Sequence, residues 1–129
     1  MHIIINNSSM TPIYEQIMEQ IKVAIITGKL EENTVLPSVR SLSKELRISA
    51  LTVKKAYDYL EKEGFTVTVH GKGTYVAATD KEVLQEEHRK KVEAELEQAI
   101  MKGRQCGLSK EEVRSLFEIL MEEYYAKGQ

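Results

Sequence analysis

Two expected helices follow each other with almost no chain between them, and this spacing constrains the fold more than any other feature. Ser38 and Ser49 are the expected N-caps of the two helices. Only two residues separate Leu46, the last apolar residue expected in the first helix, from Ser49. A turn this short prevents antiparallel packing, so the helices cross at a steep angle, as in a helix-turn-helix. The residues expected to face the core are Val39, Leu42 and Leu46 in the first helix and Val53, Ala56, Tyr57 and Leu60 in the second.

A further helix is expected before this pair. Thr11 is its expected N-cap, Pro12 its first residue and Gly28 its stop. Isoleucines four residues apart form its apolar stripe. Residues 1–9 are expected to form either a short strand or an extended arm, and 29–35 a polar linker.

After the second helix of the pair, the apolar residues change from a helical to a strand period. β-Branched residues dominate 65–69, where Phe65, Val67 and Val69 alternate with threonines. A turn with two glycines, 70–73, leads to a return strand beginning at Thr74. Three helices followed by a β-hairpin form a winged helix.

The remaining residues predict two more helices. Thr79-x-x-Glu82 and Ser109-x-x-Glu112 are capping boxes that open them, and Gly103 is the expected end of the first. About fifty residues are too few for an independent core, so their apolar faces need either the winged helix or a second copy of the chain. We expect two domains, 1–78 and a helical hairpin for dimerisation, 79–129. The residues assigned to dimerisation are Leu84, Val92, Leu96, Ile100, Val113, Leu116, Phe117, Leu120, Met121 and Tyr124.

Charge is distributed unevenly along the chain, although the net charge is only −2. Five basic residues and one acidic residue lie in 40–55, and 66–79 contains no acidic residue. From Asp80 onward, the chain contains twelve acidic and nine basic residues. This pattern indicates that the first part of the chain meets an anion and that the second does not.

Composition excludes several classes of protein. The longest apolar runs are a few residues, so neither a membrane span nor a signal peptide is expected. The single Cys106 cannot form an internal disulfide, which favours a cytoplasmic protein. Three scattered histidines leave almost nothing for a metal site, and no catalytic motif is present, so we expect neither a cofactor nor an enzyme.

Five short motifs between residues 10 and 78 resemble those of the GntR-type winged-helix regulators, in the same order and spacing. The short two-helix tail resembles the YtrA-like branch of that family. The resemblance implies a bacterial, homodimeric transcriptional regulator that acts as a repressor in preference to an activator. Such a regulator binds a palindromic operator and is often linked to transporter operons. The motifs are Pro12–Ile17 (PIYEQI), Leu36–Leu42 (LPSVRSL), Thr52–Tyr57 (TVKKAY), Leu60–Gly64 (LEKEG) and Gly71–Val76 (GKGTYV).

The expected DNA contacts come from three places. The first turn of a helix can reach base edges in the major groove, so the outward residues that follow Ser49 are assigned to reading bases. The resemblance implies that Ser38 and Arg40 bind the DNA backbone, where Arg40 also comes near a base, and that the hairpin tip enters or flanks the minor groove. The full set is Ser38, Arg40, Ser49, Ala50, Leu51, Thr52, Lys54, Lys55, His70, Gly71, Lys72, Gly73 and Thr74.

The chain departs from the family pattern at the turn and at the reading helix. Many relatives have glycine where Arg47 stands, and Arg, Pro or Asn at the positions of Ala50 and Leu51. An Ala-Leu pair cannot hydrogen-bond a base edge, but it can contact a thymine methyl or leave specificity to Thr52, the lysines and DNA shape. An operator copied from a relative is therefore a poor guide.

Two alternatives stay open. A winged helix can serve protein–protein contacts without binding DNA, although the basic 40–55 segment and the acid-free hairpin would then be superfluous. A small-molecule effector has room in a cleft between the tail helices of two subunits, but no set of residues identifies one.

Overall fold

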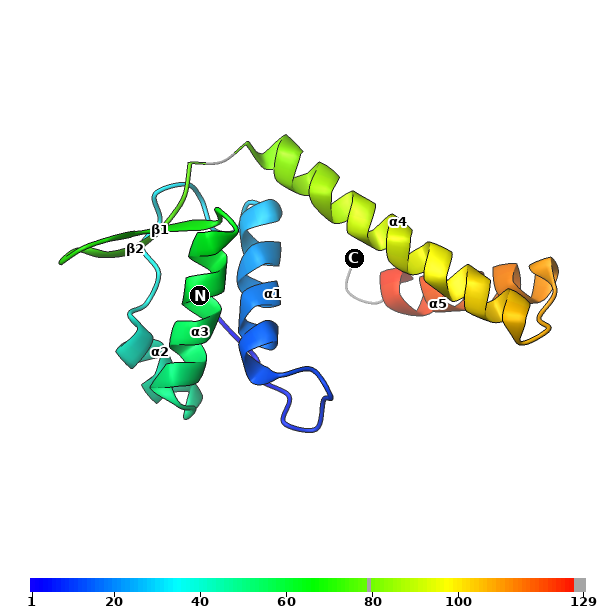
Figure 1. Cartoon of the computed structure of the whole chain (residues 1–129), viewed down its shortest axis with the longest axis horizontal. Helices are drawn as coiled ribbons and strands as arrows, with labels where there is room; N and C mark the ends of the chain where they lie inside the picture. The colour runs from blue at the N-terminus through cyan, green and yellow to red at the C-terminus, as the bar shows by residue number, and fades with distance from the viewer. Residues whose placement is uncertain (79, 127–129) are drawn as a thin grey trace. The chain divides into compact units, whose positions relative to one another are not determined.

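The computed structural model describes residues 1–78 and 80–126. Its contacts divide the chain into two compact units, Met1–Leu84 and Gln85–Gln129. The chain is mainly helical with one small antiparallel sheet, as the sequence predicts (Figure 1). The elements are α1 (Ile13–Ile26), α2 (Val39–Leu46), α3 (Ala50–Lys62), β1 (Thr66–Val69), β2 (Gly73–Val76), α4 (Lys81–Gln105) and α5 (Lys110–Ala126).

Helix α3 is the centre of the first unit, where it packs against α1, α2 and β1. The predicted core set is confirmed, because Val53, Ala56 and Leu60 are fully buried and Tyr57 nearly so. The Tyr57 hydroxyl donates a hydrogen bond to the Pro37 carbonyl at 2.7 Å and so ties α3 to the start of α2. Burial, helped by the negative charge of Glu45, raises the pKa of Tyr57 well above its ordinary range.

The predicted helix-turn-helix is also confirmed, and both serines cap as expected. Ser38 Oγ accepts a hydrogen bond from the Ser41 N–H at 3.0 Å. Ser49 Oγ accepts one from the Leu51 N–H at 3.0 Å. Arg47 ends α2 with φ 57°, in the left-handed region where glycine is favoured. This conformation explains why a glycine suits the position and shows that arginine has been accommodated there.

The chain before α1 contains no strand: residues 1–6 form an arm along α1, and residues 7–9 form a turn. The side-chain amide of Gln20 donates to the Ile4 carbonyl at 2.7 Å and accepts from the Ile4 N–H at 2.9 Å. Gln16 makes the same pair of bonds to Asn6, at 3.0 and 2.8 Å. Two glutamines of α1 therefore satisfy the backbone of the arm as a neighbouring strand would, and Ile3 is buried against the core.

The expected N-cap of α1 is wrong by one residue. Pro12 is the N-cap, and its carbonyl accepts hydrogen bonds from the N–H groups of Glu15 and Gln16, both at 3.1 Å. No side chain caps this end, so the Thr11 hydroxyl does not have the role that the sequence suggested.

The hairpin is larger than the sequence predicted, because the segment before α2 joins it. Val35 pairs with Tyr75 of β2, and the Leu36 N–H donates to the Thr74 carbonyl at 2.8 Å. The end of the segment expected to be only a polar linker thus pairs with β2 as a short third strand-like segment. Within the sheet, Thr66 and its partner Val76 are buried, whereas Val67 and Val69 lie on the exposed face.

The start of α4 belongs to the first unit. The expected cap Thr79 lies outside the described residues; Asp80 Oδ1 accepts a hydrogen bond from the Glu82 N–H at 2.9 Å. Leu84, assigned to dimerisation from the sequence, is only 4% exposed and belongs to the core of the first unit. The assignment of Leu84 to dimerisation is therefore wrong, because a side chain buried in the core of its own chain has no exposed surface for a partner.

The second unit is a pair of helices that meet at their connecting turn. Gly103 does not end α4, which continues to Gln105. A Cβ at Gly103 would stand 2.9 Å from a methyl of Val113, so glycine permits the close approach of α5 to α4. The capping box of α5 is confirmed: Glu112 Oε1 accepts from the Ser109 N–H at 3.0 Å, and this bond lowers the pKa of Glu112.

Beyond Leu84, the large apolar side chains of α4 are exposed, and so are those of α5 from Leu116 to Tyr125. No residue of α5 is buried among those described. In residues 1–78 and 80–126, no helix combines the length and apolarity needed to cross a bilayer.

Candidate nucleic-acid interface

The first turn of α3 presents the residues assigned to reading bases. Ala50 is exposed, and Leu51 is 78% exposed, the largest fraction of any large apolar residue in α3. Thr52 is half-buried, so it lies at the border of this surface and not at its centre. The hydroxyl oxygen of Ser49 accepts hydrogen bonds from the Leu51 and Thr52 N–H groups, which orients the turn.

Both lysines of this surface are exposed, but each is engaged by a neighbour. Lys54 Nζ lies 2.9 Å from a carboxylate oxygen of Asp58, one turn further along α3. Lys55 Nζ lies 4.1 Å from the centre of the Tyr14 ring, a cation–π contact with α1. Each of the two ammonium groups that follow Leu51 by one turn of α3 is thus held by a neighbouring residue.

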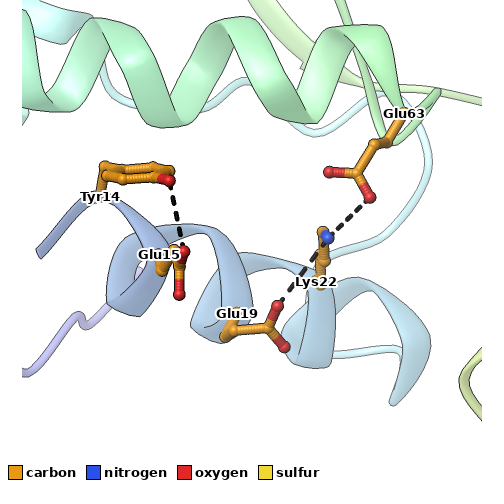
Figure 2. A network of polar contacts seen from close by, with 5 residues as sticks. All are labelled: Tyr14, Glu15, Glu19, Lys22 and Glu63. Carbon is orange, nitrogen blue, oxygen red and sulfur yellow. Dashed lines mark hydrogen bonds and ion pairs between the residues drawn. The ribbon is translucent and has the colours of Figure 1, made fainter. Parts of the chain in front are cut away.

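Tyr14 is itself fixed by two contacts. Its ring stacks on that of Tyr59 with centroids 5.7 Å apart. Its hydroxyl donates to a carboxylate oxygen of Glu15 at 3.3 Å (Figure 2). Partial burial and the Glu15 charge raise the pKa of Tyr14. The face of this fixed ring lies against the Lys55 ammonium.

Helix α2 supplies the second part of the surface. Arg40, in its first turn, is exposed, and Ser38 caps the helix from the adjoining residue. Because α2 packs against α3, these residues share a rigid base with Leu51. A capped helix end beside an exposed guanidinium is suited to a phosphate group.

The hairpin supplies the third part. His70, Gly71, Lys72 and Gly73 are exposed at its tip, whereas Thr74 is half-buried, with its hydroxyl 3.0 Å from that of Thr68. Gly71 and Gly73 have φ 77° and 127°, which other residues adopt only with strain. In Figure 1 the hairpin extends away from α1, on the side of α3 where α2 lies. All three groups of expected contacts are therefore on one unit.

An ion pair with a buried ammonium joins α1 to the C-cap residue of α3. Lys22 is 3% exposed, and its Nζ lies 2.8 Å from a carboxylate oxygen of Glu63 and 3.8 Å from one of Glu19 (Figure 2). The same ammonium lies 5.4 Å from the centre of the Phe65 ring. The pair therefore links α1 directly to the residue that follows α3.

The sequence analysis missed the partners of both lysines on the α3 surface. The Lys54–Asp58 pair has the spacing of an ion pair on one helix face and was detectable from it. The contact of Lys55 with Tyr14 joins residues 41 positions apart, and no local pattern indicates it.

Comparison with known proteins agrees with this geometry. Residues 13–76 match the family described as bacterial regulatory proteins, gntR family. The HTH-type transcriptional repressor YtrA of Bacillus subtilis (strain 168) is 37% identical over 109 residues, which cover 84% of this chain and 84% of the relative.

Solved structures give the same result. A GntR family transcriptional regulator from Listeria monocytogenes aligns with a TM-score of 0.71 and 30% identity, over 88% of this chain and 97% of that one. AraR(DBD) in complex with operator ORX1 aligns with a TM-score of 0.53 and 29% identity, over 59% of this chain and 95% of that one. The match to the family covers α1 to β2, and the match to YtrA extends beyond it. The chain belongs to the GntR family of bacterial regulatory proteins, in its YtrA-like branch.

Proposed function

We propose that this chain is a sequence-specific DNA-binding regulator that represses transcription as a homodimer. The observation that carries the proposal is the exposed first turn of α3, with Leu51 at its centre and Lys54 beside it. The repressor YtrA and the operator complex of AraR(DBD) support the extension to DNA. No family relationship favours the alternative of a module for protein contacts only.

DNA binding follows from the chemistry of the three groups of residues. Arg40 and Lys72 displace counterions from phosphates, which supplies affinity without sequence preference. The start of α3 enters the major groove, where base edges differ, and supplies the preference. The tip of the hairpin follows the minor groove, where glycines let the backbone come close.

The exposed apolar side chains of α4 and α5 support the proposal of a dimer. Phe117, Leu120 and Met121 are each more than two-fifths exposed, within one turn of α5. Apolar surface of this kind is removed from water when two copies associate about a two-fold axis. The same residues as in the sequence assignment, without Leu84, form the proposed contact. They are Val92, Leu96, Ile100, Val113, Leu116, Phe117, Leu120, Met121 and Tyr124.

A two-fold dimer recognises a palindrome, with half-sites about 10 base pairs apart. Such a protein works in the cytoplasm, where bacterial DNA lies. The YtrA-like branch extends the proposal to an operon of transporter type, and a cleft between the tails of two subunits is the proposed place for a small-molecule effector.

Selection from a random duplex library with the purified full chain tests this function. We expect a palindromic sequence to be enriched, and Arg40→Ala and Lys54→Ala to weaken its binding and reduce the salt dependence by about one ion per lost phosphate contact. Lys29→Ala, which removes an exposed charge outside the surface, is the matched control. If both variants bind the operator like wild type across a salt titration, these contacts are wrong; if no sequence is enriched, the function is wrong.

A further inference from the structure

We propose that Leu51 recognises the C5-methyl group of a thymine in each half of the operator. The inference rests on the proposed function, because it assigns a specificity-determining residue to the DNA-reading face of α3. It makes the central base contact of this regulator an apolar one.

The exposure of Leu51 is the first argument. An apolar side chain that is 78% exposed in the first turn of the reading helix gains free energy when it is covered. Its neighbour Ala50 is exposed and carries only a methyl group. Neither side chain can donate or accept a hydrogen bond, so this part of the helix cannot read a polar base edge.

The positions of the two lysines are the second argument. Lys54 and Lys55 follow Leu51 at the spacing that places side chains next to each other on a helix. Lys54 is held by Asp58 at 2.9 Å, and Lys55 by the ring of Tyr14 at 4.1 Å. Asp58 therefore holds one ammonium further along α3 and Tyr14 holds the other against α1, and Leu51 keeps 78% of its surface exposed.

The chemistry of the groove selects the occupant. Among the base edges in the major groove, only thymine presents an apolar group. A leucine placed against the amino or carbonyl group of another base would remove water from a polar atom without replacing its hydrogen bond, which is unfavourable. Leu51 therefore favours thymine over the other three bases at one position of the half-site.

Deoxyuridine tests the contact, because it differs from thymidine only by the methyl group. Each thymine of the selected operator is replaced in turn, in both half-sites, and the dissociation constant is measured with the full chain. Each lost methyl contact is expected to weaken binding about three- to four-fold. Because each replacement removes one methyl group from each half-site, we expect one such pair of replacements to weaken binding about ten-fold. Replacement of thymines elsewhere is expected to have little effect.

Variants assign this effect to the residue. Leu51→Ala is expected to bind the thymine and uracil operators equally; the side chain is largely exposed, so the fold is preserved, as circular dichroism would show. Val23→Ala, at an exposed apolar residue of α1 outside the interface, is the matched control and should keep the ten-fold difference.

Two results would overturn the inference and leave the proposed function standing. One is a wild-type protein that selects an operator but tolerates deoxyuridine at every position. The other is a Leu51→Ala variant that retains the full difference between the two operators. Failure of the wild type to select any duplex would instead remove the proposed function, and the inference with it.

Discussion

Leu60 and Leu116 are leucines in helices of similar length, but Leu60 is fully buried in the first unit and Leu116 is 51% exposed in the second. The difference is general. In the first unit α3 is covered by α1, α2 and β1, whereas α5 has no buried residue among those described. A helix whose apolar side chains lie in water gains little from folding alone.

The two units therefore differ in what covers their apolar side chains. The first unit completes its core with its own residues and can hold a reading surface rigidly. The second unit has apolar faces that we assign to another copy of the chain. The free energy of unfolding of the first unit should therefore be independent of protein concentration, whereas that of the second should increase with protein concentration.

The strongest test of this contrast compares the two leucines directly. Leu60→Ala is expected to lower the free energy of unfolding by about 2–5 kcal/mol, because it leaves a cavity in the core. Leu116→Ala is expected to act through association, so its effect should depend on protein concentration. Urea unfolding of both variants at two concentrations measures this; the same concentration dependence for both would break the comparison.

The next largest effect is expected from a charge in the proposed dimer contact. Phe117→Glu should raise the dissociation constant of the dimer by about 30-fold or more, since a central aromatic contributes about 2 kcal/mol or more to an interface. Sedimentation measures the dimer, and circular dichroism should show an intact fold. Glu122→Gln, on another side of α5, is the control. A Phe117→Glu protein that remains dimeric would contradict the assignment of this face.

Two ion pairs of similar length sharpen the comparison. Lys22–Glu63 joins a buried ammonium to a carboxylate at 2.8 Å, whereas Arg89–Glu86 joins two exposed groups at 2.6 Å. Glu63→Gln is expected to lower the free energy of unfolding by about 2 kcal/mol, because the buried ammonium loses its charged partner. Glu86→Gln should leave unfolding unchanged, because exposed pairs contribute little. Equal effects in urea titrations would argue against the difference in burial.

The smallest expected effect concerns a hydroxyl. Tyr57→Phe removes the hydrogen bond to the Pro37 carbonyl and should lower the free energy of unfolding by about 1 kcal/mol at neutral pH. Tyr125→Phe, at an exposed tyrosine of α5, is the control and should have no effect.

The pH dependence of this effect has a definite sign. Because the pKa of Tyr57 is raised in the folded state, the stability that its neutral form contributes is complete below the ordinary value of 10.0 and is lost as the pH rises above it. The advantage of wild type over Tyr57→Phe should therefore disappear in alkaline solution. An advantage that stays constant to pH about 11 would contradict the burial of this phenol.

Local signals determined much of this protein. The caps at Ser38 and Ser49 and the apolar spacing between them predicted the helix-turn-helix, because capping and amphipathic periodicity act within a few residues. The change of period after Gly64 predicted the hairpin for the same reason. The order of the motifs then indicated the family.

Contacts between distant segments were decided only by the tertiary structure. The pairing of Val35 with Tyr75, the burial of Leu84 in the first unit and the position of Lys55 over Tyr14 each depend on a partner far away in the chain. The residues adjacent in sequence do not indicate such a partner, because packing depends on the three-dimensional arrangement of whole helices and strands. The sequence therefore specified which elements form, and the packing of those elements determined which side chains are left to meet DNA.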